Sequence, residues 1–106
     1  MSFLQNYINQ IRQLCEAHRV KALFAFGSVT TDRFSNNSDV DLVVDFEDLD
    51  PIDYADNYFD LKFCLQDLLK RPIDLLEGKA LRNPFLIQKI ENTKVPVYGN
   101  WNKGLA

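Results

Sequence analysis

The chain has 106 residues, which is enough for one domain with a single modest core and too few for two. Its hydrophobic fraction of 46% and charged fraction of 25% are those of an ordinary globular protein. A net charge of −3 excludes the broad basic surface of a nucleic-acid-binding protein, and no apolar run approaches the length of a membrane span or has the form of a signal peptide. We therefore expect a cytoplasmic protein that binds neither nucleic acid directly nor a membrane.

A helix is predicted from Ser2 through about His18, because Ser2 and Gln5 form a capping box and apolar residues recur at helical spacing. Apolar runs predict a first strand at 20–26, ended by Gly27, and a second strand at 40–46. The polar segment between them is predicted to be a loop that Phe34 anchors to the core. His18, the one histidine, is expected to cap carbonyl groups at the helix end rather than to catalyse a reaction.

Asp50 and Pro51 mark the start of a long helix that reaches Lys70. Its expected apolar face comprises Ala55, Tyr58, Phe59, Phe63, Leu65, Leu68 and Leu69. A third strand is predicted at 73–76, a short helix at 85–91 after Asn83-Pro84, and an extended edge segment at 95–98. This order predicts one α/β (α+β) domain over 1–99, a small mixed β-sheet packed by helices, followed by a C-terminal tail at 100–106.

The two cysteines, Cys15 and Cys64, fall within helical patterns rather than in metal-binding pairs. We expect both to be reduced, buried thiols without a redox or zinc role.

Three acidic residues interrupt the predicted strands: Asp39, Asp41 and Asp74. Alternate residues of a strand share a face, so Asp39 and Asp41 point the same way, roughly 6.6 Å apart. If the second and third strands are neighbours in register, Asp74 joins them at one end of the sheet. Carboxylates so placed repel each other unless a cation lies between them, and oxygen ligands with room for water suit Mg²⁺. We predict a site for Mg²⁺, with two ions able to hold the attacking and leaving oxygens of a phosphoryl-type displacement. Asp45, farther along this face, is expected at the surface or behind the ligands.

Gly27 and Ser28 end the first predicted strand and form a candidate phosphate site. Glycine lets the backbone approach a phosphate closely, and the Ser28 hydroxyl and the following N–H groups can donate to its oxygens. Arg33 is a candidate to neutralise a terminal phosphate. A Gly-Ser turn and an Asp-x-Asp pair are each common alone, but together they favour a nucleotide site.

Gly27-Ser28, ten residues, and then Asp39-Val40-Asp41 form a pattern that resembles the motif of the DNA polymerase β-like nucleotidyltransferase superfamily. The short chain is similar to its minimal nucleotidyltransferase (MNT) branch, which includes MntA-like antitoxins. The resemblance covers most of the chain and implies the polymerase β-like nucleotidyltransferase fold.

The same resemblance implies a role for each motif residue. Asp39 and Asp41 would ligate Mg²⁺, Asp74 would complete the site and help to activate an acceptor hydroxyl, and Gly27 and Ser28 would hold the triphosphate. The implied reaction is transfer of a nucleoside monophosphate, AMP from ATP, with release of pyrophosphate.

Members of the MNT branch commonly pair with a small helical HEPN-domain protein, so the resemblance implies such a partner. Three functions stay open. The first is a protein adenylyltransferase acting on that partner. The second is a catalytically weak or inactive module that neutralises the partner by binding alone, because the segment 29–32 replaces the small and basic residues that often follow Gly-Ser. The third is a small-molecule nucleotidyltransferase whose acceptor pocket a homodimer would supply.

Overall fold

A four-stranded sheet with strand order β3–β2–β1–β4 forms the centre of the computed structural model, which describes residues 2–31, 34–35 and 37–99. The strands are β1 (Val20–Phe26), β2 (Val40–Phe46), β3 (Ile73–Glu77) and β4 (Val95–Gly99). β1 runs antiparallel to both β2 and β4, whereas β3 is parallel to β2. The predicted small mixed sheet is therefore confirmed, with β4 at one edge.

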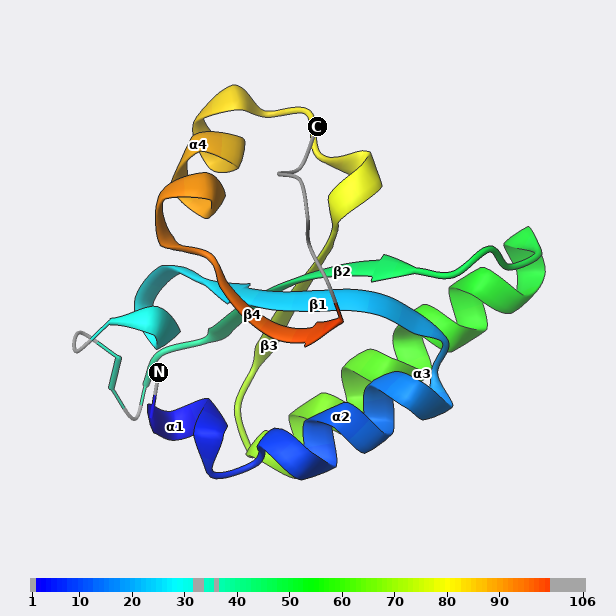
Figure 1. The fold of residues 1–106 in the computed structure, drawn as a ribbon, viewed down its shortest axis with the longest axis horizontal. Helices are drawn as coiled ribbons and strands as arrows, with labels where there is room; N and C mark the ends of the chain where they lie inside the picture. The colour runs from blue at the N-terminus through cyan, green and yellow to red at the C-terminus, as the bar shows by residue number, and fades with distance from the viewer. Residues whose placement is uncertain (1, 32–33, 36, 100–106) are drawn as a thin grey trace.

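The helices lie on both faces of this sheet. α2 (Ile8–Ala17) and α3 (Pro51–Leu69) cover one face, and α4 (Pro84–Thr93) lies on the other (Figure 1). Two short 3₁₀ turns, η1 (Gly27–Thr30) and η2 (Gly78–Ala80), follow β1 and β3. The expected domain over 1–99 stays a prediction, and the expected tail at 100–106 lies outside the described residues.

The alternation along β2 sorts its side chains between two cores. Val40, Leu42 and Val44 pack in the larger core with residues of α2 and α3. Val43 packs on the opposite face with Phe24, Phe26 and Ile90. Because Asp41 and Val43 are alternate residues, the Asp41 side chain belongs to the face that α4 covers.

The prediction of one continuous first helix is wrong. The structure divides it into α1 (Ser2–Gln5) and α2, and the Tyr7 N–H donates to the Leu4 carbonyl in the turn between them. Leu4 is fully buried, and the Phe3 ring lies 5.1 Å from the ring of Phe34. Packing of the buried Leu4 and the half-buried Phe3 fixes the first turn against the core and outweighs the helical periodicity. The Phe3 contact also confirms that Phe34 anchors its loop to the core.

The expected apolar face of α3 is only partly correct. Leu61, Leu65 and Leu69 are buried, whereas Phe59 and Phe63 are 53% and 59% exposed. Positions two residues apart lie about 200° apart around a helix, so a stripe through Leu61 and Leu65 turns Phe59 and Phe63 toward solvent. Aromatic content alone could not show which of these two stripes faces the sheet.

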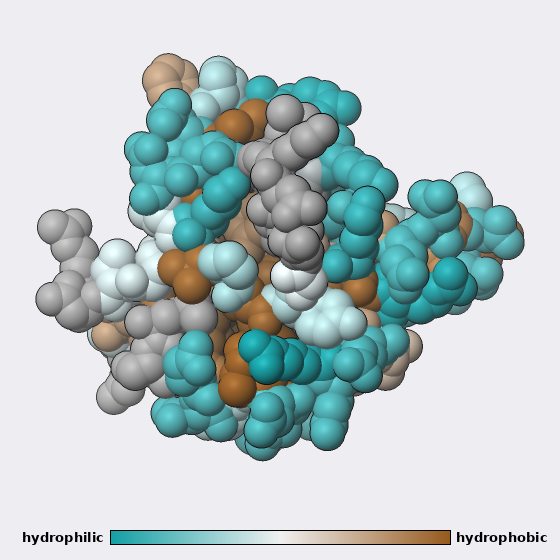
Figure 2. All heavy atoms as spheres, in the orientation of Figure 1, coloured by the Kyte–Doolittle hydropathy of each residue, from teal (hydrophilic) through white to brown (hydrophobic). Residues whose placement is uncertain are grey.

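The start of α4 follows its predicted cap, since Asn83 Oδ1 accepts hydrogen bonds from the N–H groups of Phe85 and Leu86. The start of α3 differs, because Asp50 precedes it without a side-chain cap. None of the described helices is long and apolar enough to cross a membrane. On the face drawn in Figure 2 the surface is mostly hydrophilic, and hydrophobic residues show mainly near the middle of the sheet.

Candidate active site

Strand register brings two of the three predicted acidic residues side by side. Asp41 on β2 is the register partner of Asp74 on β3, and on its other side it is the partner of Phe26 on β1. Asp39 directly precedes β2 and is exposed. β2 and β3 are therefore neighbours in register, which was the condition for Asp74 to join Asp41. The acidic residues lie at the end of the sheet where β1 ends and β2 and β3 begin.

Gly27 brings the backbone against this acidic group. Its φ of +73° lies in the left-handed region, and a Cβ built on it would lie 2.8 Å from Asp41 Oδ2. A side chain at residue 27 would therefore be strained and would collide with the carboxylate. The glycine is required here both by its conformation and by its contact with Asp41.

The charges around Asp41 are predominantly negative. Burial raises the pKa of the Asp41 carboxyl above its ordinary value, and repulsion from Asp74 and Asp39 raises it further. The positive charge of Lys89, on α4, acts in the opposite direction. Net repulsion among carboxylates is the electrostatic condition that a bound cation relieves.

The donor set fits Mg²⁺ in its chemistry. Asp39, Asp41 and Asp74 offer only carboxylate oxygens, the hard ligands that this ion prefers. Among the described residues, the carboxylate oxygens of these three side chains do not all lie within 4.8 Å of one another. Opposite ligands of one octahedral Mg²⁺ lie about 4.2 Å apart, so binding all three directly to a single ion requires side-chain rotation. Coordination through water is the alternative.

Two residues of α4 that the sequence did not single out join this site. The Gly27 N–H donates to Thr93 Oγ1 over 3.0 Å, and the Thr93 hydroxyl donates to the Lys89 carbonyl over 2.9 Å. Thr93 thus fixes the Gly27 turn to the helix that also carries the Lys89 charge. The one available sequence signal was the four-residue spacing of Lys89 and Thr93 on a helix, which places both on one face.

Short hydrogen bonds fix the Gly27-Ser28 turn itself. The Thr30 hydroxyl donates to the Gly27 carbonyl over 2.7 Å, and the Thr31 N–H and hydroxyl both donate to the Ser28 carbonyl. The Gly27 N–H donates to Thr93, so a phosphate bound at this turn would take its hydrogen bonds from the Ser28 hydroxyl and the N–H groups after it. Arg33, the predicted phosphate-binding cation, lies outside the described residues.

Arg71 fastens the loop that leads into Asp39. Its Nη1 donates to the carbonyls of Ser35 and Ser38, and its guanidinium lies 4.6 Å from the Phe34 ring centroid. The sequence marked Arg71 only as part of a small basic cluster, since its carbonyl partners are more than thirty residues away in the chain.

Asp45 lies at the other end of β2 from Asp41. It is half-buried, and one of its carboxylate oxygens lies 3.5 Å from Lys79 Nζ. Asp45 is thus paired with Lys79 and is not part of the acidic group around Asp41.

A mixed sheet with a Gly-Ser turn facing acidic strand residues is the framework of the nucleotidyltransferase class. Residues 9–102 match the family described as "Polymerase beta, Nucleotidyltransferase". The chain belongs to this family, and it is a nucleotidyltransferase.

Among proteins of known sequence, the chain is similar to "Putative protein adenylyltransferase MJ0128" of Methanocaldococcus jannaschii. The two are 33% identical over 84 residues, which cover 79% of this chain and 83% of the relative. Among solved structures it is similar to a "putative minimal nucleotidyltransferase", with a TM-score of 0.71 and 27% identity over 88% of this chain and 91% of the other.

Two more distant structures share the fold. One is a toxin–antitoxin with AMP-PNP, at a TM-score of 0.69 and 24% identity, covering 88% of this chain and 73% of that chain. The other is a tri-AMPylated Shewanella oneidensis HEPN toxin in complex with MNT antitoxin. It has a TM-score of 0.63 and 22% identity, covering 91% of this chain and 72% of that one.

Proposed function

We propose that this protein is a Mg²⁺-dependent adenylyltransferase that transfers AMP from ATP to a hydroxyl group of a partner protein. The observation that carries the proposal is the register pairing of Asp41 with Asp74 beside the close approach of Gly27. The related M. jannaschii protein is named for protein adenylylation, and one structural neighbour is a complex with AMP-PNP. Use of ATP places the proposed reaction in the cytoplasm.

In the proposed reaction the acceptor oxygen forms a bond to the α-phosphorus of ATP. The bond from that phosphorus to the oxygen bridging the α- and β-phosphates breaks, and pyrophosphate leaves with the bonding electrons. Asp74 accepts the proton of the acceptor hydroxyl, while the Ser28 hydroxyl donates to a phosphate oxygen and orients the triphosphate. Asp39, Asp41 and Asp74 would hold Mg²⁺, which supplies positive charge opposite the phosphates when bound.

A helical HEPN-type protein is the proposed partner. One structural neighbour is a tri-AMPylated HEPN toxin in complex with an MNT antitoxin, which supports a HEPN-type protein as the acceptor. The exposed side chains of Ile52, Phe59 and Phe63 on α3 support a protein partner, because large exposed apolar side chains gathered on one helix are typical of contact surfaces.

Transfer of label from ATP tests the catalytic proposal. The protein is incubated with Mg²⁺, the HEPN-type protein encoded nearest to it, and ATP labelled at the α- or the γ-phosphate. We expect the α-label alone to appear on the partner. We expect the Asp39→Asn/Asp41→Asn double variant to lose the transfer and Asp45→Asn, a change on the same strand and face, to keep it. Undiminished transfer by the double variant would refute the assignment.

Neutralisation by binding alone is the second candidate. The segment 29–32, which replaces the small and basic residues that often follow Gly-Ser, favours it. Its test is protection of cells that produce the partner toxin. Protection by the double variant equal to that of wild type would support this candidate, whereas loss of protection together with loss of label transfer would support catalysis.

A further inference from the structure

A second group of possible metal ligands lies on the sheet face opposite Asp41. His18 follows the last turn of α2, and Asp60 and Cys64 lie four residues apart on α3, so both face the same way. The His18 ring nitrogen, a carboxylate oxygen of Asp60 and the Cys64 sulfur all lie within 4.8 Å of one another. This is a group that the sequence-based expectation of two inert thiols and a capping histidine did not foresee.

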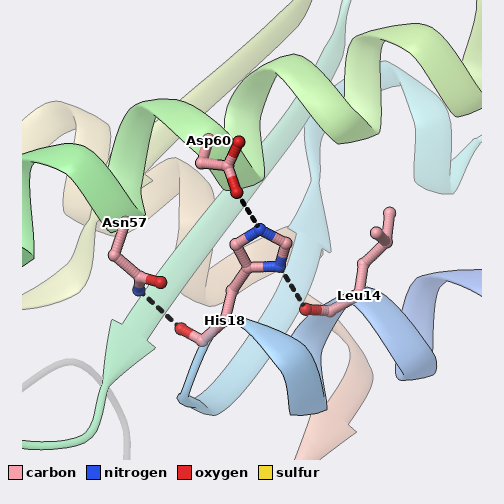
Figure 3. A network of polar contacts seen from close by, with 4 residues as sticks. All are labelled: Leu14, His18, Asn57 and Asp60. Atoms are coloured by element: carbon pink, nitrogen blue, oxygen red, sulfur yellow. Dashed lines mark hydrogen bonds and ion pairs between the residues drawn. The ribbon is translucent and has the colours of Figure 1, made fainter.

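The His18 ring is held in the orientation of a metal ligand. Its Nδ1 donates to the Leu14 carbonyl over 2.7 Å, and the ring is directed so that Nε2 faces Asp60 Oδ2 at 2.7 Å (Figure 3). Metal-binding histidines commonly donate the other ring N–H to a backbone carbonyl in this way, which fixes the tautomer. The Asn57 side chain also donates to the His18 carbonyl, so the residue is fixed from both ends.

Both ring nitrogens of His18 therefore face oxygen acceptors, although a neutral imidazole carries only one N–H. The His18 side chain is almost fully buried, whereas its partner Asp60 is largely exposed. A second ring proton would satisfy the contact between Nε2 and Asp60, and so would a metal ion bound to both after a small increase in their separation. The position of Cys64 favours the metal ion, because a soft sulfur beside a nitrogen and a carboxylate adds a ligand that a simple ion pair does not need.

We propose that His18 Nε2, Asp60 Oδ2 and Cys64 Sγ bind one divalent transition-metal ion of the zinc class and so join α2 to α3. Zinc bond lengths place ligands about 3.3–3.8 Å apart, a distance that the three atoms reach by small side-chain rotations. The fourth position opens to solvent, because the Asp60 side chain is 70% exposed and Cys64 lines a groove of about 490 Å³ between α2 and α3. Mg²⁺ is not expected here, since it avoids sulfur and nitrogen ligands.

Cobalt substitution tests this site by a signal that carboxylates cannot give. Metal-free protein is titrated with Co²⁺ in the presence of excess Mg²⁺, which occupies the carboxylate group around Asp41. We expect one equivalent to produce a sulfur-to-cobalt charge-transfer band together with the visible bands of tetrahedral cobalt, and one equivalent of Zn²⁺ to remove them. The other thiol, Cys15, is fully buried and cannot supply the signal.

Substitutions test whether the three proposed ligands, and not neighbouring residues, bind the metal ion. We expect Cys64→Ser to abolish the charge-transfer band and Asp60→Asn to weaken Zn²⁺ binding at least tenfold, while Asp67→Asn, which removes a neighbouring charge on α3, binds as wild type. Zn²⁺ should also raise the thermal unfolding midpoint of wild type but not of Cys64→Ser.

The proposal would be overturned if wild type gave no cobalt band, or if wild type and Cys64→Ser bound Zn²⁺ with equal affinity. His18 and Asp60 would then form only an ion pair. Nucleotide transfer plays no part in these readouts.

Discussion

The partly buried carboxylate of Asp41 is repelled by the neighbouring acids of the proposed active site. Its pKa is raised by burial and by two neighbouring acids, so the folded protein holds the Asp41 proton more tightly than the unfolded chain does. The contribution of this group to stability is therefore fully present below the ordinary pKa of 3.8 and is lost as the pH rises through the raised pKa. The metal-free protein is less stable at neutral pH because of it.

We expect Asp41→Asn to increase the free energy of unfolding at pH 7 in the presence of EDTA. The gain should be on the order of 1 kcal/mol or less, the scale of a partly exposed charge interaction. It should vanish below pH 3.8, where the wild-type carboxyl is itself neutral. Nucleotide transfer should fall on the order of 10²–10³-fold.

Urea unfolding at pH 7 and pH 3.5, with transfer assays in parallel, measures both effects. Asp48→Asn, an exposed acidic change beyond the end of β2, is the control and should alter neither quantity. A variant less stable than wild type at pH 7 without metal would contradict the repulsion argument.

Gly27→Ala should damage both the fold and the site. The left-handed φ of +73° costs an alanine about 1–2 kcal/mol, and the new methyl group would force the Asp41 carboxylate away. Gly99→Ala is the comparison, because residue 99 also has a positive φ and a crowded Cβ position, but next to Lys21 and Ala22 at the sheet edge. Calorimetry and ATP-binding assays should show a stability loss in both variants and a loss of ATP binding beyond that explained by unfolding only in Gly27→Ala.

At the scale of elements, α4 holds the Gly27 turn in place through one side chain. Thr93→Val keeps the shape of Thr93 but leaves the Gly27 N–H without its acceptor. An unsatisfied backbone donor costs about 1–3 kcal/mol, so the free energy of unfolding should fall by that amount. Because the turn would also lose its fixed position, the KM for ATP should rise.

Thr93→Ser keeps the hydroxyl and should restore most of the stability and the KM. Gln88→Ala, on the exposed side of α4 where the Gln88 side chain donates to Asn92, should change neither quantity. A Thr93→Val protein with the KM of wild type would show that α4 does not position the turn.

The elements that the sequence predicted well are those whose signals are local. β1 and β2 are bounded by Gly27 and by the alternation that starts at Val40, and α4 begins at a cap made by Asn83. Lys89 and Thr93 were missed because their importance depends on Gly27, more than sixty residues earlier in the chain. Only the folded structure shows that α4 faces that turn.

The same distinction applies to the candidate metal ligands. Asp39 and Asp41 are close in the sequence, and Asp74 could be added because an acid within an apolar strand is costly unless it is paired. Their roles as ligands stay a prediction, although the register places Asp41 beside Asp74. His18 and Cys64 gave no comparable signal, because the contact between them depends on how α2 packs against α3.

Considered as a whole, the molecule uses the two faces of its sheet for different tasks. α2 and α3 bury the larger core, with Leu61 and Leu65 fully enclosed, while α4 and Leu81 pack on the face that carries Asp41. Acidic side chains can remain partly exposed on this second face because less apolar surface lies over them. The packing that gives stability and the charge repulsion that favours a cation are therefore on opposite sides of one sheet.

This division predicts that Mg²⁺ stabilises the whole fold. A cation that binds the folded acidic group and not the unfolded chain adds about 2.7 kcal/mol of stability at one hundred times its Kd, and the thermal midpoint should rise by several degrees.

Scanning calorimetry with and without MgCl₂, at an ionic strength held constant with KCl, separates site binding from general screening of the net charge of −3. The Asp39→Asn/Asp41→Asn variant should begin with the higher midpoint in EDTA and gain nothing from Mg²⁺, so that the two unfolding curves approach each other as the ion is added. A parallel rise in both proteins would place the bound Mg²⁺ elsewhere on the surface and separate the acidic group from any metal-dependent reaction.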